Sequence, residues 1–331
     1  MQTIDLTNLE ESAAQILGGG FNSTADEQMP TGSLPWDGIS MPIRGITHVD
    51  DALNKAGLNW RVKQEPIYRA GHPEPIRGRV ANIREDTGEF IEIVSNRYKP
   101  VQNSQAFNFL EGVLDSGAMQ LENAGCFGYD SVFLLARTEG ITVLGDKIVP
   151  YALIKNSHDR SSGVKVCLTP VRVVCRNTLA LALRTAKRVW QAKHLGSIDE
   201  RMKEAQLMLN LTTKYVEEFP VVAEMMNGIN LAEPEIVKVL QKMFPVKPDA
   251  GVRAQTAVKE AVAEIMTIYL HKPDLKKFDG TAWGFYNAVG DYVTHHVPKE
   301  TKGWQESRLN IIANGHPLME IAQRELMMVH A

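Results

Sequence analysis

The chain has 331 residues with 36 lysines and arginines and 39 aspartates and glutamates, so its formal net charge is −3. Hydrophobic residues make up 44% and charged residues 23%, which is ordinary for a soluble chain of one large or two modest domains. No apolar run reaches the roughly 18 residues of a membrane span. The N-terminus lacks the basic region of a secretory signal, and Cys126, Cys167 and Cys175 lack metal-ligand spacing. We therefore expect a cytoplasmic protein with reduced thiols.

Residues 1–42 are predicted to form a flexible arm, because a short helical pattern is followed by a stretch rich in Gly, Ser, Pro and Asn. Two roles are open for Trp36 in this arm. It anchors the arm on a neighbouring molecule, or it packs on its own domain.

Residues 43–196 read as an α+β core. A short helix is expected over 47–56 with Thr47 as its cap, and a strand over 60–68. Three hairpins follow, each with alternating strands around Gly or Asp turn residues: Val80–Arg84 with Phe90–Val94, Met119–Phe127 with Ser131–Arg137, and a pair of short strands within Ile141–Val149.

A helix is predicted between the first two hairpins, capped by Asn103 or Ser104 and running to Leu114. Its apolar residues at helical spacing should face inward: Ala106, Phe107, Leu110 and Val113. This order of elements predicts an antiparallel sheet with helices on one face, a β-β-β-α core followed by helices.

The stretch from Tyr151 to Ile198 holds most of the positive charge. Its nine cations and single acid give +8, which leaves −11 for the remainder because the whole chain carries −3. Such asymmetry favours a polyanionic partner. The alternative is that these charges only solvate surface strands and a helix. The cations are Lys155, Arg160, Lys165, Arg172, Arg176, Arg184, Lys187, Arg188 and Lys193.

We expect this stretch to form a β-hairpin with a polar, basic tip over 156–163, followed by extended structure that Pro170 interrupts. A helix then begins at Asn177 or Thr178. Its apolar stripe should pack on the sheet, and its cations should form a row beside it. The stripe comprises Leu179, Leu183, Ala186 and Trp190, and the row Arg184, Lys187 and Arg188 with Gln191.

Residues 197–331 are expected to be a separate helical domain. Ser197 and Glu200 suggest a capping box, Pro234 opens another helix, and further helices are predicted over Val252–His271, Thr281–His296 and Pro317–Val329.

Enzymatic readings find little support in the sequence. Glu89 and Glu92 alternate to opposite faces of one strand, which disfavours a metal site. His158 lies in a turn, where a turn role or a phosphate contact is favoured over acid–base chemistry. Asp291 and His295 lack a third metal ligand, and no phosphate-binding G-x-x-x-x-G-K-[ST] motif occurs. We expect no enzyme activity, cofactor or metal.

Three long motifs carry a family resemblance: VSNRYKPVQNSQAFNFLEGVL, KNSHDRSSGVKVCLTPVRVVCRNTLALALR and FDGTAWGFYNAVGDYVTHH. They resemble a phage- and plasmid-like family known as a domain of unknown function, over roughly Ile43 to His296. The resemblance implies an origin in mobile elements and no particular chemistry. Pro35-Trp36-Asp37-Gly38 departs from the family's Trp-His-Gly-like segment by lacking the histidine, which leaves the arm's role open.

The order of strands closed by a basic helix also resembles the core of ring-forming single-strand annealing proteins. That resemblance implies a groove that holds the DNA backbone and leaves the bases exposed, in a ring or filament of identical subunits.

We therefore predict an ATP-independent protein that binds and anneals single-stranded DNA in recombination, as a homo-oligomer and without a membrane role. The alternative is a mobile-element accessory protein, such as a host-defence antagonist, that acts through protein contacts on its acidic surface. The predicted nucleic-acid contacts are Arg97, Tyr98 (stacking on a base), Lys99, Lys155, His158, Arg160, Lys165, Arg172, Arg176, Arg184, Lys187 and Arg188.

Overall fold

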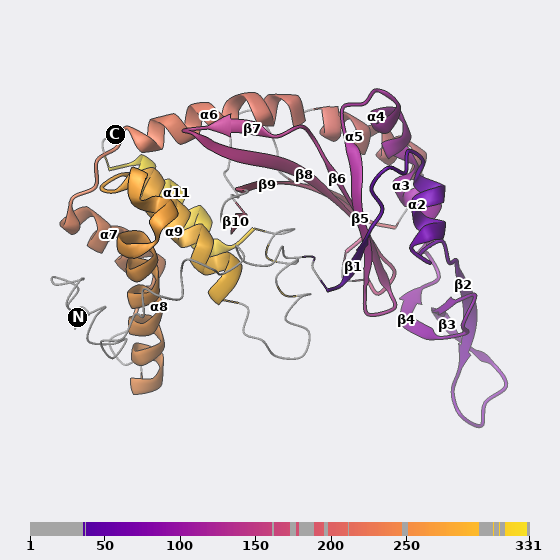
Figure 1. The fold of residues 1–331 in the computed structure, drawn as a ribbon. Helices are drawn as coiled ribbons and strands as arrows, with labels where there is room; N and C mark the ends of the chain where they lie inside the picture. The colour runs from indigo at the N-terminus through magenta and orange to yellow at the C-terminus, as the bar shows by residue number, and fades with distance from the viewer. Residues whose placement is uncertain are drawn as a thin grey trace.

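The computed structural model describes residues 36, 38–160, 162–172, 177–178, 189–194, 198–210, 212–246, 251–297, 307, 311 and 315–329. Within them, two antiparallel sheets are followed by a helical C-terminal region (Figure 1). The α+β class predicted from the sequence is confirmed.

The larger sheet has eight strands in the described residues. Its order is β1-β5-β6-β8-β9-β10, with β7 paired to β8 and β11 paired to β9. The bounds are β1 (Ser40–Pro42), β5 (Gln120–Phe127), β6 (Ser131–Arg137), β7 (Ile141–Val143), β8 (Asp146–Ser157), β9 (Val164–Arg172), β10 (Asn177–Thr178) and β11 (Val189–Ala192).

The predicted hairpins are all present. β5 pairs with β6 around a turn in which Gly128 has a positive φ of 55°, a conformation that costs glycine little. β7 pairs with β8 around Gly145, and β8 pairs with β9 as the central hairpin. β8 is longer than the short strand we expected, because its buried residues pair with β6 on one side and β9 on the other.

Pro170 does not interrupt the sheet, contrary to the prediction. It lies within β9 directly opposite Pro150 of β8. The carbonyl of Pro150 accepts a hydrogen bond from the Thr138 amide at 3.0 Å, so the polar edge of Pro150 faces away from β9. The two prolines therefore form a pair that exchanges no backbone hydrogen bonds, where a missing N–H costs the ladder nothing.

The helix predicted from Asn177 through Trp190 is also wrong where the structure describes it. Asn177 and Thr178 form β10, and Trp190 lies in β11, paired with Val166. Val189 and Trp190 are β-branched and aromatic, and pairing with the open edge of β9 overrides the helical spacing. Residues 179–188, with the rest of that stripe, lie outside the described residues.

The smaller sheet has the order β2-β3-β4, with bounds β2 (Val62–Tyr68), β3 (Pro75–Arg84) and β4 (Phe90–Ser95). It projects from one end of the molecule, and the β2–β3 hairpin extends beyond the end of β4 (Figure 1). The cross-strand pairs at its outer end are Tyr68 with Pro75 and Arg79 with Ser95.

Short helices connect the two sheets: α2 (Val49–Lys55), α3 (Asn103–Phe107), the 3-10 turn η2 (Asn108–Leu110) and α4 (Glu111–Asp115). The single helix predicted over 103–114 is thus three segments, although all four of its inward residues are buried. The predicted cap at Thr47 is replaced, because the Val49 amide donates to a carboxylate oxygen of Glu111 at 2.8 Å.

The C-terminal region contains α5 (Ile198–Asn210), α6 (Thr212–Asn227), α7 (Glu233–Met243), α8 (Val252–His271), η3 (Pro273–Phe278), α9 (Ala282–Asp291), a π-helical turn η4 (Tyr292–His296) and α11 (Pro317–Met327). α5 and α6 run along the larger sheet, and α7, α8, α9 and α11 gather at the opposite end from the smaller sheet (Figure 1). None of the helices described is both long enough and apolar enough to span a bilayer.

The core is divided by the alternation of side chains along the larger sheet. One face, including Leu134 and Ile154, joins the helices in the main cluster, which reaches Phe219 of α6. The other face carries a smaller cluster with Phe133 and Tyr151. Trp36 is 1% exposed in this smaller cluster, with its ring 4.9 Å from that of Tyr151. Of the two roles left open for Trp36, the structure therefore shows the second, in which it packs on its own chain.

A substitution at Gly163 tests the pairing of β11 with the central hairpin. A Cβ atom at Gly163 would lie 1.7 Å from the Ala192 carbonyl oxygen, whereas one at Gly228 has no atom nearer than 3.5 Å. We expect Gly163→Ala to lower the free energy of unfolding by about 1–3 kcal/mol or more, the usual cost of overpacking. Gly228→Ala is the control in urea denaturation. Equal, small effects of the two substitutions would contradict the position of β11.

A buried polar junction and a candidate nucleic-acid interface

The end of the central hairpin is held by a group of buried polar side chains, which we call the polar junction. Its members come from both sheets and from the segments between them: Asn82, Tyr98, Asn103, Asn156, His158 and His194. All six are at most 9% exposed. Buried polar groups are costly unless they are hydrogen-bonded, so their contacts define the local structure.

Asn156, at the end of β8, is the hub of the junction. Its Nδ2 donates to the Val101 carbonyl at 2.9 Å and to the Asn103 Oδ1 at 3.0 Å. Its Oδ1 lies 2.9 Å from the His194 Nε2. One amide group therefore links β8, the start of α3 and the segment after β11.

His158 lies beside this hub, in the turn of the central hairpin. Its Nε2 is 3.1 Å from the Asn103 Oδ1, and its ring centroid is 5.2 Å from that of Trp60. Its backbone carbonyl accepts from the Asn82 Nδ2 of β3 at 3.0 Å, which fastens the hairpin turn to the smaller sheet. Burial, together with the nearby His194, lowers the pKa of His158 to about 3.

Tyr98 and His194 close the other side of the junction. The Tyr98 hydroxyl forms a short hydrogen bond with the His194 Nδ1, and their ring centroids are 5.1 Å apart. Burial lowers the pKa of His194 to about 4 and raises that of Tyr98, with a further contribution from the Asp159 carboxylate. All three rings of the junction are therefore neutral near pH 7, and the junction positions its neighbours instead of carrying charge.

Exposed cations surround this neutral junction. Arg97 and Lys99 flank the buried Tyr98, and Lys193 precedes His194. The Lys99 amide donates to the His194 carbonyl at 3.2 Å, so these two segments run side by side. Arg160 leaves the hairpin turn, donates to the Ile93 carbonyl at 3.0 Å and lies 3.9 Å from the Glu92 carboxylate, with 55% of its side chain exposed.

The predicted contact residues thus divide into groups. Arg97, Lys99 and Arg160 are exposed near one end of the hairpin, and their role as nucleic-acid contacts stays a prediction. His158 is 0% exposed and Tyr98 9%, so neither the imidazole nor the phenol ring is accessible to a strand on the surface in this conformation.

Lys155 and Lys165 are cross-strand partners on the face of the larger sheet that bears the smaller apolar cluster, and each is 7% exposed. Arg172 ends β9 with its side chain outside the description. Arg176, Arg184, Lys187 and Arg188 lie outside the described residues, so their prediction stays a prediction.

Several residues of the junction were missed by the sequence analysis. Asn103 was read only as a helix cap, and Asn156 only as a turn residue. His158 stands in the polar stretch 156–163 and His194 follows Lys193, so no apolar pattern in the sequence marks either ring as buried. Pairing them required the register of β8, β9 and β11, which a pattern in one chain does not supply.

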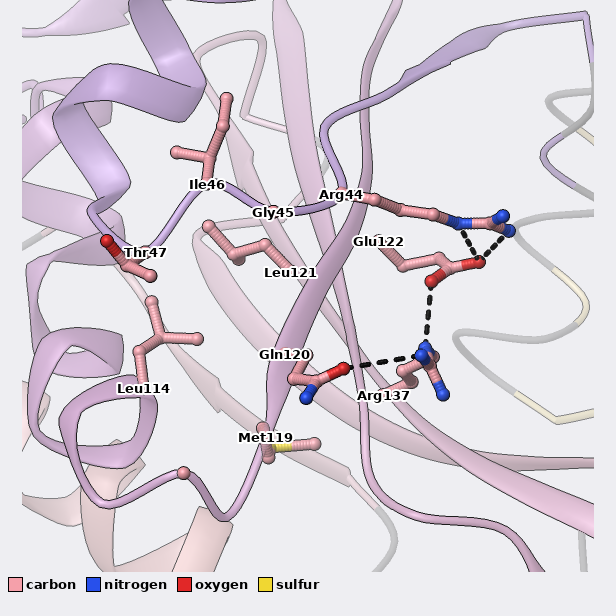
Figure 2. A pocket seen from close by; sticks show the side chains of 11 residues that line it. Arg44, Gly45, Ile46, Thr47, Leu114, Met119, Gln120, Leu121, Glu122 and Arg137 are labelled. Atoms are coloured by element: carbon pink, nitrogen blue, oxygen red, sulfur yellow. Dashed lines mark hydrogen bonds and ion pairs between the residues drawn. The ribbon is translucent and has the colours of Figure 1, made fainter.

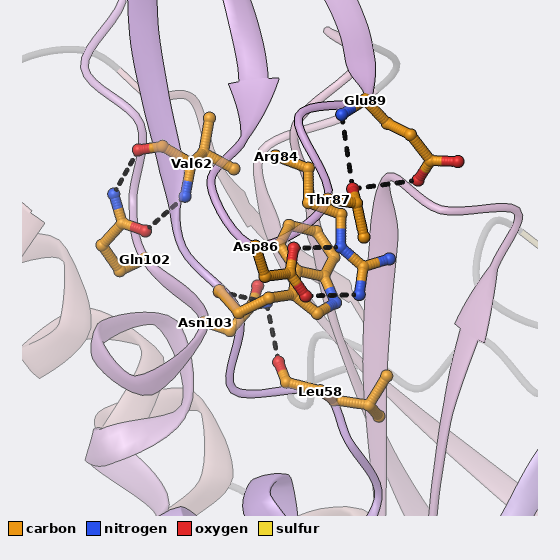
Figure 3. A network of polar contacts seen from close by, with 9 residues as sticks. Leu58, Val62, Arg84, Asp86, Thr87, Glu89, Gln102 and Asn103 are labelled. Carbon is orange, nitrogen blue, oxygen red and sulfur yellow. Dashed lines mark hydrogen bonds and ion pairs between the residues drawn. The ribbon is translucent and has the colours of Figure 1, made fainter.

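A second polar network supports the smaller sheet (Figure 3). The Arg84 guanidinium donates to both oxygens of Asp86, at 2.8 and 3.0 Å, and stacks over the Trp60 ring at 4.7 Å. The Gln102 amide pairs with both backbone polar groups of Val62, each at 2.9 Å. Gln102 thereby occupies the edge of β2 as a neighbouring strand would.

A pocket of about 320 Å³ lies between the segment 44–47, the end of α4 and strands β5 and β6 (Figure 2). Its polar side is an ion-pair group in which Glu122, 3% exposed, accepts from Arg44 and Arg137. The Nε atoms of both arginines lie 2.9 Å from the Glu122 carboxylate. Two cations on one buried carboxylate hold the segment after β1 against β5 and β6, so Glu122 serves as a structural anion.

The acids considered for metal binding take part in other contacts. Glu92 lies opposite Asn82 in the smaller sheet, while Glu89 accepts from the Thr87 hydroxyl at 3.2 Å (Figure 3). Asp291 pairs with Lys272, and its Oδ1 lies 3.7 Å from the His296 Nε2. Across the described residues, no three His, Cys, Asp or Glu side chains gather as metal ligands would.

These features define an α+β protein with a neutral buried junction ringed by exposed cations. The chain belongs to the family described as "Domain of unknown function (DUF932)", whose model matches residues 90–313, more than half of the chain. The match begins at β4 and leaves β2 and β3 outside. No curated protein and no solved structure matches the chain at a significant level.

The two buried histidines predict a specific loss of stability in acid. Unfolding restores their ordinary pKa near 6.5, so the unfolded chain binds more protons than the folded chain below that pH. The folded pKa values of about 3 and 4 keep both rings neutral down to about pH 4. The free energy of unfolding should therefore fall between about pH 6.5 and pH 4, by roughly 1 kcal/mol per pH unit for each histidine.

Urea denaturation across this pH range measures the effect. The double substitution His158→Gln and His194→Gln should flatten the pH dependence, whatever its effect on absolute stability. His72→Gln, at an exposed histidine, is the control. An equally steep decline in the double variant and in the control would show that the junction is not its source.

Proposed function

We propose that this protein binds single-stranded DNA through its backbone, without ATP, and anneals complementary strands. The observation that carries the proposal is the set of exposed cations around the polar junction: Arg97, Lys99, Arg160 and Lys193. They come from three separate segments. The Lys99 amide donates to the His194 carbonyl, and the Arg160 guanidinium donates to the Ile93 carbonyl, so hydrogen bonds hold these segments together. Cations fixed on a rigid frame bind phosphates with less entropic loss than mobile ones.

The charge distribution along the chain supports the same partner. Residues 151–198 carry +8, and Lys193 of this stretch reaches the junction beside Lys99. In this proposal the basic residues outside the description, Arg176, Arg184, Lys187 and Arg188, extend the interface. Phosphate contacts of this kind make binding tolerant of sequence and sensitive to salt.

Tyr98 takes a different role in the proposal from the one its sequence suggests. Its ring is buried and its hydroxyl is bonded to His194, so it positions Arg97 and Lys99 instead of stacking on a base. His158 likewise positions Arg160. Both are positioning residues, which act on the strand through the cations beside them.

The finer parts of the proposal rest on resemblance. The three long motifs resemble a phage- and plasmid-like family, which supports a role in mobile-element recombination. The order of strands predicted from the sequence resembles that of ring-forming annealing proteins, although both described ends of the helix expected to close it are strands. The order of strands supports assembly of several copies into a ring or filament, with the C-terminal helices making subunit contacts.

A second candidate function is favoured by the outer face of the smaller sheet. Phe90 is 52% and Ile93 38% exposed there, and their cross-strand partners Ile83 and Ala81 lie on the same face. An exposed apolar patch suits a protein partner. An accessory protein acting by protein contacts would retain its partners in a pull-down after nuclease treatment, whereas a nucleic-acid-binding protein would lose partners bridged by DNA.

Binding of labelled single-stranded oligo(dT), followed by fluorescence anisotropy at low and high salt, tests the first proposal. We expect binding at low salt that weakens steeply as salt is added. The triple substitution Arg184→Glu, Lys187→Glu and Arg188→Glu should weaken it strongly.

The matched control is Lys238→Glu, Lys242→Glu and Lys259→Glu, which makes the same change of net charge at exposed positions of α7 and α8. This control should bind like the unmodified protein. Absence of binding at low salt, or equal loss in the two triple variants, would refute the proposal.

A further inference from the structure

The outer part of the β2–β3 hairpin, which we call the β2–β3 ribbon, is an exposed extension of the smaller sheet. β4 pairs with β3 only as far as Arg79, opposite Ser95. Beyond that point, β2 and β3 form a two-stranded ribbon in which every residue from Pro75 to Arg79 is exposed. An isolated two-stranded ribbon is marginally stable in water, because it buries little apolar surface. Packing in the core therefore does not account for the kinds of side chain that the ribbon carries.

The charges of the smaller sheet differ between its base and its tip. At the base the cations are paired: Arg61 with Glu85 at 3.6 Å, Lys63 with Glu65 at 2.8 Å and Arg84 with Asp86 at 2.8 Å. At the tip, residues 66–80 contain three arginines and one acid, Glu74. Among the residues described, none of these arginines forms an ion pair with a carboxylate. The Arg69 guanidinium donates to a ring nitrogen of His72 at 2.9 Å.

Two further features of the tip indicate the chemistry of its partner. Tyr68 is 56% exposed, next to Arg69 and opposite Pro75. An exposed phenol ring beside guanidinium groups provides a stacking surface and phosphate donors together, the combination used by proteins that bind single strands. An arginine fork binds a phosphate through two N–H groups, which a lysine cannot do.

The ribbon is also continuous with the interface proposed above. The Asn96 amide donates to the Gly78 carbonyl at 3.2 Å, so the ribbon joins the segment of Arg97 and Lys99 directly. Arg79 is paired with Ser95, which lies two residues before Arg97. The Lys99 amide in turn donates to the carbonyl of His194, the neighbour of Lys193. A strand held at the polar junction would meet the ribbon as its next surface.

We propose that the tip of the β2–β3 ribbon, residues 66–80, is a second contact for single-stranded nucleic acid. Arg69, Arg77 and Arg79 bind backbone phosphates, and Tyr68 stacks on a base. This inference rests on the proposed function. It adds a contact that lies outside the matched family region and that the basic stretch of the sequence does not contain.

The test compares binding of labelled oligo(dT) over a range of salt concentrations. The triple variant R69A/R77A/R79A should bind more weakly, and its plot of log K against log salt should be less steep by about 2, since each lost phosphate contact removes roughly 0.7 from the slope for a single strand. The control K238A/K242A/K259A removes three exposed cations elsewhere and should keep the original slope.

Tyr68 is tested separately, because stacking releases no counterions. Y68A should weaken binding about five- to one-hundred-fold at unchanged slope, and Y68F should match the unmodified protein. Circular dichroism checks that each variant is folded, and sedimentation measures its oligomeric state.

The outcomes separate this inference from the proposed function. If the unmodified protein binds and R184E/K187E/R188E abolishes binding while R69A/R77A/R79A retains full affinity and slope, the ribbon is not a contact and the proposed function stands. A changed oligomeric mass with an unchanged slope would make the ribbon a subunit contact and overturn the inference. If the unmodified protein does not bind, the proposed function and the inference fail together.

Discussion

The structure depends on one buried amide group. Asn156 donates to Val101 and Asn103 and lies within hydrogen-bonding distance of His194, so three segments far apart in the sequence meet at its side chain. Removing it would leave several buried partners without hydrogen bonds, and such groups cost about 1–3 kcal/mol each. These hydrogen bonds also fix the orientation of the Asn156 side chain, because its NH₂ group and its oxygen meet suitable partners in only one orientation of the amide.

Because of this constraint, exposed cations lie close together although no charged side chain is buried in the polar junction. The rings of Tyr98, His158 and His194 are held neutral by burial, and the cations stand outside them on the same segments. The buried Tyr98 fixes where its sequence neighbours Arg97 and Lys99 lie. The buried His194 does the same for Lys193. The same contacts fasten the smaller sheet through Asn82, so its ribbon has a fixed root beside those cations.

The sequence was informative where structure is local and less so where it depends on pairing. Turns with Gly, Asp and Asn predicted the hairpins, and helical spacing predicted the inward residues of the segment after Asn103. The helix expected through Trp190 was wrong, because an open strand edge outweighed the spacing of apolar residues. Arg97, Lys99 and Arg160 are exposed. The burial of Tyr98 and His158 depends on contacts with residues 96 and 55 positions away in the sequence, which composition and periodicity do not contain.

Photo-crosslinking of single-stranded DNA carrying a photoreactive base, followed by mass spectrometry of the linked peptides, shows whether one strand lies along the cations held by the polar junction. We expect linked peptides from residues 66–99 and from 151–194, and their loss when salt is raised. Crosslinks confined to the C-terminal helices α7 to α11, or crosslinks that persist unchanged at high salt, would rule out a strand bound at the junction.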